Sequence, residues 1–139
     1  MADSDVRALV RDMYAAYERL DFERVASFLH DDIDWMIYGP VGVFPFAGPR
    51  KGKADVLKAL AEIGETYALQ SYKPEVIVVD GNRAAVMSDV NFAQRATGRT
   101  MRFRLANFLR LEDGQVIEFR EFANTFDLVE QALGRWLQV

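Results

Sequence analysis

The chain of 139 residues contains no cysteine and a single histidine, His30. Without cysteine, disulfides, thiolate catalysis and thiolate metal sites are excluded. One histidine cannot build a zinc site by itself, so we expect no metal centre and no cofactor. No apolar run approaches the length of a membrane-spanning helix, so we expect no membrane partner. No basic stretch offsets the net charge of −4, which argues against a nucleic-acid partner.

Length and composition are those of an ordinary globular domain. Half of the residues are hydrophobic and 27% are charged, and a chain of this length buries about two thirds of its unfolded surface. The N-terminus is acidic and lacks the apolar stretch that a secretion signal contains. We therefore expect one domain over residues 1–139, in the cytoplasm.

Hydrophobic spacing divides the chain into helices first and strands later. A period near 3.6 predicts a helix, and strict alternation predicts a strand. The predicted elements are helices over 6–20, 22–29 and 53–67, a strand over 33–38, four strands over 72–79, 83–93, 101–111 and 115–125, and a closing helix over 126–136. This order indicates an α+β fold with helices against one face of a curved antiparallel sheet.

Two polar residues interrupt apolar rows in the last two predicted strands. Between the ends of both strands the odd positions are apolar, except for Asn107 in the first and Glu121 in the second. Because alternate side chains share one face of a strand, both residues should face the interior. There they either bond only to each other and to protein, or they line a cavity that binds a ligand. We favour the cavity, because a polar pair in such a row is costly without a use.

The turn at residues 112–114 sets the register of these two strands. A two-residue Asp-Gly loop would place the apolar rows on opposite faces of the sheet. A three-residue loop, with Gly114 in the left-handed region, keeps them on one face. In that register Leu105 lies opposite Glu121, and Asn107 is a diagonal neighbour of Glu121.

A second carboxylate, Asp89, lies in the predicted strand 83–93. Its odd face, which also carries Met87, is either pocket lining or a solvated surface. Two carboxylates around a dry cavity would repel each other and raise the pKa of one of them towards neutrality. Asp89 and Glu121 would then form an acid/base pair.

Several apolar and aromatic residues are candidates for the wall of the cavity. Tyr14 and Tyr17 point from the first helix to the sheet; they are core residues by default, but their hydroxyls need partners that a pocket offers. The segment 39–52 is a loop with three of the four prolines and four of the nine glycines, and we expect it to cap the pocket and to be mobile. The further lining candidates are Trp35, Tyr38, Phe44, Phe46, Met87, Leu105 and Phe119.

The opposite face of the last two strands mixes arginines with aromatics. Its residues are Arg102, Arg104, Phe108, Arg110, Glu118, Arg120 and Phe122. Aromatic and arginine side chains together are typical of a desolvated two-fold contact. We expect a homodimer through this face.

Several local sequences resemble the nuclear transport factor 2-like superfamily, and within it the SnoaL-like polyketide cyclase and ketosteroid isomerase branch. They are Leu20-Asp21-Phe22-Glu23, Phe28-Leu29-His30-Asp31-Asp32, Gly39-Pro40, Gly52-Lys53-Ala54-Asp55-Val56 and Phe108-Leu109-Arg110-Leu111-Glu112-Asp113-Gly114. The resemblance covers essentially the whole chain. It implies a cone-like fold around a pocket and a homodimer, and leaves the function open, since members include isomerases, cyclases, hydrolases and binders.

Residue by residue, the resemblance to ketosteroid isomerases is partial. Their general base precedes a proline after the first strand, where this chain has Gly39. Their oxyanion-hole tyrosine corresponds most nearly to Met13, with Tyr14 one position away, and their protonated aspartic acid corresponds to Asn107. Ordinary ketosteroid isomerisation is therefore not expected.

The chain also bears a fainter likeness to limonene epoxide hydrolase. That likeness places Glu121 and Asp89 at two catalytic carboxylates, with Met87 where an arginine is required. The missing guanidinium argues against epoxide hydrolysis.

Two functions of different classes remain. In the first, Asp89 and Glu121 perform acid/base chemistry and Asn107 donates to a developing oxyanion. The substrate would be a small apolar carbonyl compound such as a polyketide, steroid-like or terpenoid molecule, and the reaction an isomerisation, cyclisation or hydrolysis. In the second, the same cavity or the outer sheet face serves a non-catalytic binding or assembly module.

Overall fold

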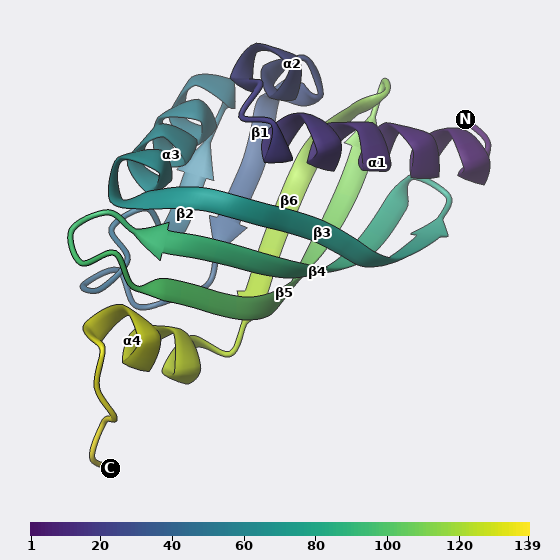
Figure 1. The fold of residues 1–139 in the computed structure, drawn as a ribbon. Helices are drawn as coiled ribbons and strands as arrows, with labels where there is room; N and C mark the ends of the chain where they lie inside the picture. The colour runs from purple at the N-terminus through teal and green to yellow at the C-terminus, as the bar shows by residue number, and fades with distance from the viewer.

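Six strands form one curved sheet in the order β2-β1-β6-β5-β4-β3 (Figure 1). The computed structural model describes residues 1–139. Its elements are α1 (Asp3–Glu18), α2 (Phe22–Ser27), β1 (Leu29–Ile37), β2 (Gly48–Lys51), α3 (Lys53–Thr66), β3 (Tyr67–Asp80), β4 (Arg83–Gln94), β5 (Thr100–Glu112), β6 (Gln115–Ala123) and α4 (Thr125–Leu133). The predicted α+β order is confirmed, and the strands begin or end a few residues from the predicted bounds.

Helices α1, α2 and α3 lie on the concave side of the sheet, and α4 lies beside the end where β5 begins (Figure 1). α1 buries Val6, Val10, Met13 and Tyr14, which recur every three or four residues on one side of the helix. α3 buries Val56, Leu60 and Ile63 at the same spacing. One hydrophobic core is therefore enclosed between these helices and the sheet.

The β5–β6 hairpin differs from its predicted register. Its turn is a two-residue loop, with Asp113 at φ 53° and Gly114 at φ 74°, the left-handed conformation that an Asp-Gly hairpin turn favours. A β-bulge follows, because Arg110 pairs with Glu118 while the next residue of β5 pairs with Val116. Ile117 is the extra residue, and it shifts the alternation of β6 by one position. The tight turn and a common apolar face are thus compatible.

As a result, Asn107 lies directly opposite Glu121, and Leu105 lies opposite Ala123. The prediction that Asn107 and Glu121 share the concave face is confirmed, whereas the predicted pairing of Leu105 with Glu121 is wrong. On its other side β6 pairs in parallel with β1, so that Glu121 is next to Ile37. Glu121 therefore lies on an interior strand of the sheet.

The segment 39–52 is more ordered than a plain loop. It contains β2, which pairs antiparallel with β1, and it buries Phe44 and Ala47 against the core. Its apolar residues thus help to close the concave side, as expected, and its mobility stays a prediction.

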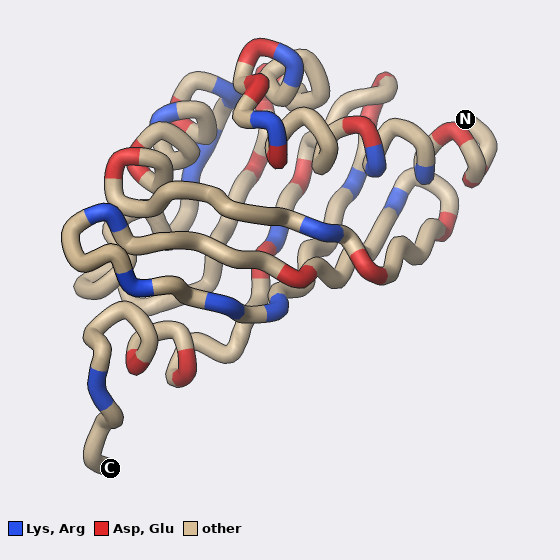
Figure 2. Tube along the Cα trace, in the orientation of Figure 1, with Lys and Arg blue, Asp and Glu red and all other residues tan.

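None of the helices combines the length and the apolar character that crossing a membrane requires. Basic residues follow one another along β5, and acidic residues lie on the neighbouring strands, as in the Arg102–Asp89 and Arg104–Glu75 ion pairs (Figure 2).

Candidate functional site

A cavity of about 130 Å³ lies between the concave face of the sheet and the helices. Of the 25 residues in its wall, 22 are hydrophobic, so the cavity suits an apolar molecule. The structure brings most of the predicted site residues together there. The wall includes Tyr14, Tyr17, Trp35, Tyr38, Phe44, Phe46, Leu105, Phe119 and Glu121.

Glu121 is the one carboxylate in this wall. Its Oε1 accepts a hydrogen bond of 3.0 Å from Asn107 Nδ2. None of the ion pairs of the structure involves Glu121, because the arginines of β5 and β6 lie on the other face. Burial raises the pKa of Glu121 to about 7, against the smaller opposing effect of the Asn107 hydrogen bond. Glu121 is therefore poised to accept or donate a proton near neutral pH.

Two tyrosines fix the orientation of the Asn107 amide. Tyr14 donates its hydroxyl to Asn107 Oδ1 at 2.6 Å, and Tyr72 donates to the same oxygen at 3.4 Å. With two donors on the oxygen, the amide nitrogen must point the other way, towards Glu121. The network thus selects which end of the amide meets the carboxylate.

Asn107 itself does not reach the cavity. Its side chain is completely buried, it is absent from the cavity wall, and its amide bonds to Tyr14, Tyr72 and Glu121. The prediction that Asn107 donates to a substrate oxygen is wrong, because Tyr14 and Tyr72 cover one end and Glu121 the other. Asn107 is a positioning residue for Glu121.

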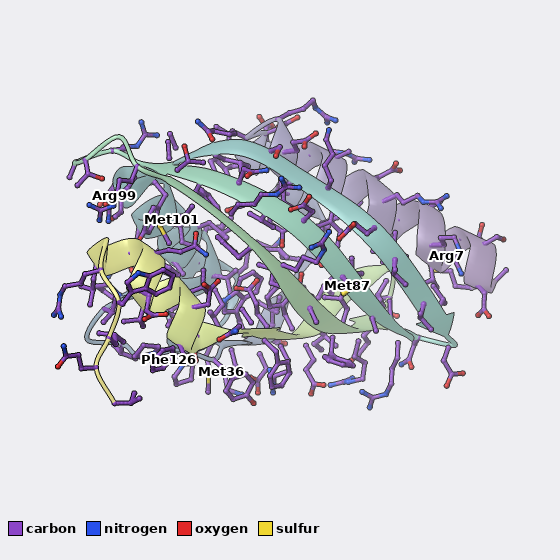
Figure 3. The ribbon with its side chains drawn as sticks, turned by 60° about the horizontal axis from the view of Figure 1, so that its bottom comes forward. Arg7, Met36, Met87, Arg99, Met101 and Phe126 are labelled. Carbon is purple, nitrogen blue, oxygen red and sulfur yellow. The ribbon has the colours of Figure 1, made fainter.

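Asp89 and Met87 lie outside the cavity, on the outer face of β4. The inward positions of β4 are the even ones, including Val86, Ser88 and Val90, which are buried. Met87 is 41% exposed, and Figure 3 shows it on β4 well away from Met101 of the cavity wall, which lies beside α4.

The predicted pairing of Asp89 with Glu121 is therefore wrong. Asp89 forms an ion pair of 2.8 Å with Arg102, whose hydrogen bond lowers the pKa of Asp89. The raised pKa of Glu121 comes from its burial, since no second carboxylate lies in the cavity wall.

Tyr72 is a residue of this hydrogen-bond network that the sequence pattern did not indicate. It is buried at the centre of β3, and its ring stacks against Tyr14 at 5.6 Å and meets Tyr17 edge-on at 5.4 Å. The available signal was a tyrosine at an inward position of a strand, because a buried phenol needs a hydrogen-bond partner. A register for β3 would have been needed to name that partner.

Tyr17 differs from the other tyrosines near Glu121. It lines the cavity on the same side of α1 as Tyr14, but no hydrogen bond to protein engages its hydroxyl, whereas Tyr14 and Tyr72 both donate to Asn107. Burial, and secondly the charge of Glu121, raises the pKa of Tyr17. The Tyr17 hydroxyl is thus a neutral donor beside the carboxylate.

A possible set of metal ligands, His30, Glu112 and Asp113, lies away from the cavity at the β5–β6 turn. Both acidic residues are exposed, and an exposed acidic cluster is not by itself a metal site. It contributes nothing to the chemistry around Glu121.

A cone of curved sheet and helices around an apolar cavity defines the nuclear transport factor 2-like class of small-molecule-binding folds. The chain belongs to the SnoaL-like domain family, whose model matches residues 10–119. The predicted superfamily and branch are thereby confirmed. No curated protein matches the chain.

Solved structures with the same fold cover nearly the whole chain. A protein from Rhodopseudomonas palustris, provisionally named as an isomerase, is 35% identical with a TM-score of 0.84, over 97% of this chain and 100% of its own. A nuclear transport factor 2-like protein of unknown function from Burkholderia pseudomallei is 19% identical, with a TM-score of 0.85 over 95% and 98%. A provisionally named polyketide cyclase from Xanthomonas campestris is 20% identical, with a TM-score of 0.79 over 94% and 98%.

Proposed function

We propose that the protein is an acid/base enzyme that transfers a proton on a small apolar carbonyl compound, with Glu121 as the catalytic residue. The observation that carries this proposal is a carboxylate with a pKa of about 7 in the wall of an apolar cavity. A general base of this pKa is close to the optimum for work at neutral pH. The relative from Rhodopseudomonas palustris, named provisionally as an isomerase, supports the same class of reaction.

The geometry of Glu121 divides its two oxygens between two tasks. Oε1 is held by Asn107, which leaves Oε2 to take a proton from a carbon next to the substrate carbonyl. The electron pair of the broken C–H bond moves to the carbonyl oxygen and forms an enolate. Where a double bond is conjugated with the enolate, Glu121 returns the proton to the far carbon, which completes an isomerisation. Alternatively, the enolate carbon attacks a second carbonyl of the substrate, which closes a ring, and the alkoxide formed takes the proton back from Glu121.

Dimerisation through the outer sheet face belongs to the same proposal. Phe108 is 52% exposed and Phe122 is 45% exposed, and Phe122 contacts both Phe108 and Tyr38. Arg120, which lies opposite Phe108 in the sheet, is already paired within the chain with Asp34. Two copies of this face could therefore meet without uncompensated charge.

A non-catalytic binding protein is the second candidate, because Gly39 lines the cavity where related isomerases carry their base. Exchange of substrate protons separates the two candidates. The native protein should accelerate exchange of the protons next to the carbonyl of 1-tetralone with D₂O, followed by NMR. Glu121→Gln should lower that rate by about 10²–10⁴-fold.

The matched control is Asp89→Asn, which removes a carboxylate from the outer face and should leave the exchange rate unchanged. Equal rates in the native protein and Glu121→Gln would show that Glu121 transfers no proton, and would favour the binding protein.

A further inference from the structure

We propose that the cavity selects an uncharged compound of about two fused rings with a carbonyl oxygen that is held by Tyr17. This inference rests on the proposed function, since it names the substrate class of the same site. Three features of the cavity carry it: the charges in the wall, the donors in the wall and the volume.

The charges in the wall argue against an anionic ligand. The wall contains no lysine, arginine or histidine, and the arginines of β5 and β6 point to the outer face, where they pair with Asp89, Glu75, Glu118 and Asp34. A carboxylate or phosphate on the ligand would be buried without a cation and would face Glu121. Burying an unpaired charge is among the most expensive events in a protein interior. Ligands that bear a carboxylate or phosphate group are therefore excluded from the cavity.

The donors near Glu121 indicate where the carbonyl oxygen of the ligand binds. Three tyrosines of the wall lie near the reacting group. Tyr14 and Tyr72 bond to Asn107, which holds Glu121, and the ring of Tyr17 contacts that of Tyr72. Tyr14 and Tyr72 are occupied by Asn107, and Tyr17 alone keeps a free hydroxyl. The Tyr17 ring meets both Tyr72 and Phe22 edge-on, which holds the hydroxyl in place. A carbonyl oxygen that accepts from Tyr17 would gain the donor that an enolate requires.

The volume indicates the size of the ligand. The cavity of about 130 Å³ corresponds to roughly ten water positions, or about 300 Å³ of liquid water. That value is at the lower limit for small-molecule sites. Two fused rings with a short substituent fill such a space.

Binding of three naphthalenes of equal size tests the proposal by calorimetry at pH 8, where Glu121 is mostly ionised. The probes are 2-acetonaphthone, with a neutral carbonyl, 2-naphthoate, with a carboxylate, and 2-isopropylnaphthalene, without oxygen. We expect 2-acetonaphthone to bind at least tenfold more tightly than 2-naphthoate. Tyr17→Phe should lower the affinity for 2-acetonaphthone by about 2–10-fold, the range of one hydrogen bond. The affinity for 2-isopropylnaphthalene, which has no oxygen, should stay unchanged.

Glu121→Gln separates this proposal from the proposed function. This variant should still bind 2-acetonaphthone, even though it exchanges no protons, and should bind 2-naphthoate more tightly than the native protein does. Binding of 2-naphthoate equal to that of the ketone would overturn the proposal, and so would tighter binding of 2-(aminomethyl)naphthalene, which would indicate a site for amines. If Tyr17→Phe binds the ketone as tightly as the native protein does, Tyr17 does not bind the carbonyl oxygen, and this part of the proposal is wrong.

Discussion

The two faces of the sheet shift the pKa of a carboxyl group in opposite directions. Asp89 on the outer face of β4 lies beside Arg102, whose hydrogen bond lowers the pKa of Asp89. Glu121 on the inner face of β6 has one neutral donor, Asn107, and burial raises its pKa to about 7. The position of each residue in the strand alternation, and not the residue type, decides which carboxylate can exchange a proton near neutral pH.

The largest expected effect is on the pH dependence of stability, and it tests the environment of Glu121. Its pKa is about 7 in the folded protein, against an ordinary value of 4.5. Below about pH 4.5 the proton is bound in both states and Glu121 has no effect. As the pH rises from 4.5 to 7 the unfolded state ionises first, so the free energy of unfolding falls, by roughly 3 kcal/mol in total.

Glu121→Gln should remove this loss, since glutamine does not ionise and its side-chain oxygen can still accept from Asn107. Urea unfolding at about pH 4.5 and pH 8 measures the difference. A variant that loses as much stability as the native protein between these pH values would show that Glu121 is not desolvated.

The second prediction creates, behind the cavity wall, the carboxylate pair that Asp89 does not form with Glu121. Asn107→Asp places a second carboxylate against Glu121, and the hydroxyls of Tyr14 and Tyr72 stabilise its ionised form. The repulsion and the loss of the amide donor should raise the apparent pKa of proton exchange by at least about one unit, or roughly 1.4 kcal/mol. The pH profile of 1-tetralone exchange measures it, with Asp89→Asn as the control. An unshifted profile would mean that residue 107 does not act on Glu121.

The contrast between the two faces also shows what the sequence could predict. The apolar rows placed Asn107 and Glu121 on one inner face, because alternation along a strand is a local property. Two further facts depended on packing between strands. The bulge at Ile117 allows the tight Asp113-Gly114 turn, and no local signal requires it. The odd face of β4 was ambiguous, because Met87 and Asp89 are compatible with either a pocket or a solvated surface.

The contacts of Asn107 could not be predicted from the sequence for a related reason. Its contact with Tyr14 joins residues 93 positions apart, and its contact with Tyr72 joins residues 35 apart. The sequence predicted a polar residue that needs partners, but only the relative placement of α1, β3 and β5 shows that two tyrosines supply them. For this reason Asn107 was predicted to donate to the substrate, whereas in the structure it donates to Glu121.

A third prediction separates the two tyrosines of α1. Tyr14→Phe removes the 2.6 Å hydrogen bond to Asn107, which should cost about 1 kcal/mol of stability. It should lower kcat for 1-tetralone exchange several-fold with little change in KM, because the Tyr14 hydroxyl is bonded to Asn107 and acts on Glu121 through it. Tyr17→Phe is the matched comparison and should raise KM, since its hydroxyl binds the carbonyl. Identical kinetic changes in the two variants would contradict this division of roles.

The smallest expected effect is on the outer face, where the comparison predicts almost none. Arg102→Ala removes the ion pair with Asp89, but the arginine side chain is 66% exposed, and exposed ion pairs contribute little to stability. Without Arg102 the pKa of Asp89 should rise towards its ordinary value, because the hydrogen bond that lowers it is lost. NMR titration of Asp89 would record that change, while the pH profile of exchange should stay as in the native protein. A shift in the exchange profile would show that charge on the outer face reaches Glu121 through the sheet, and the two faces would then not be electrostatically separate.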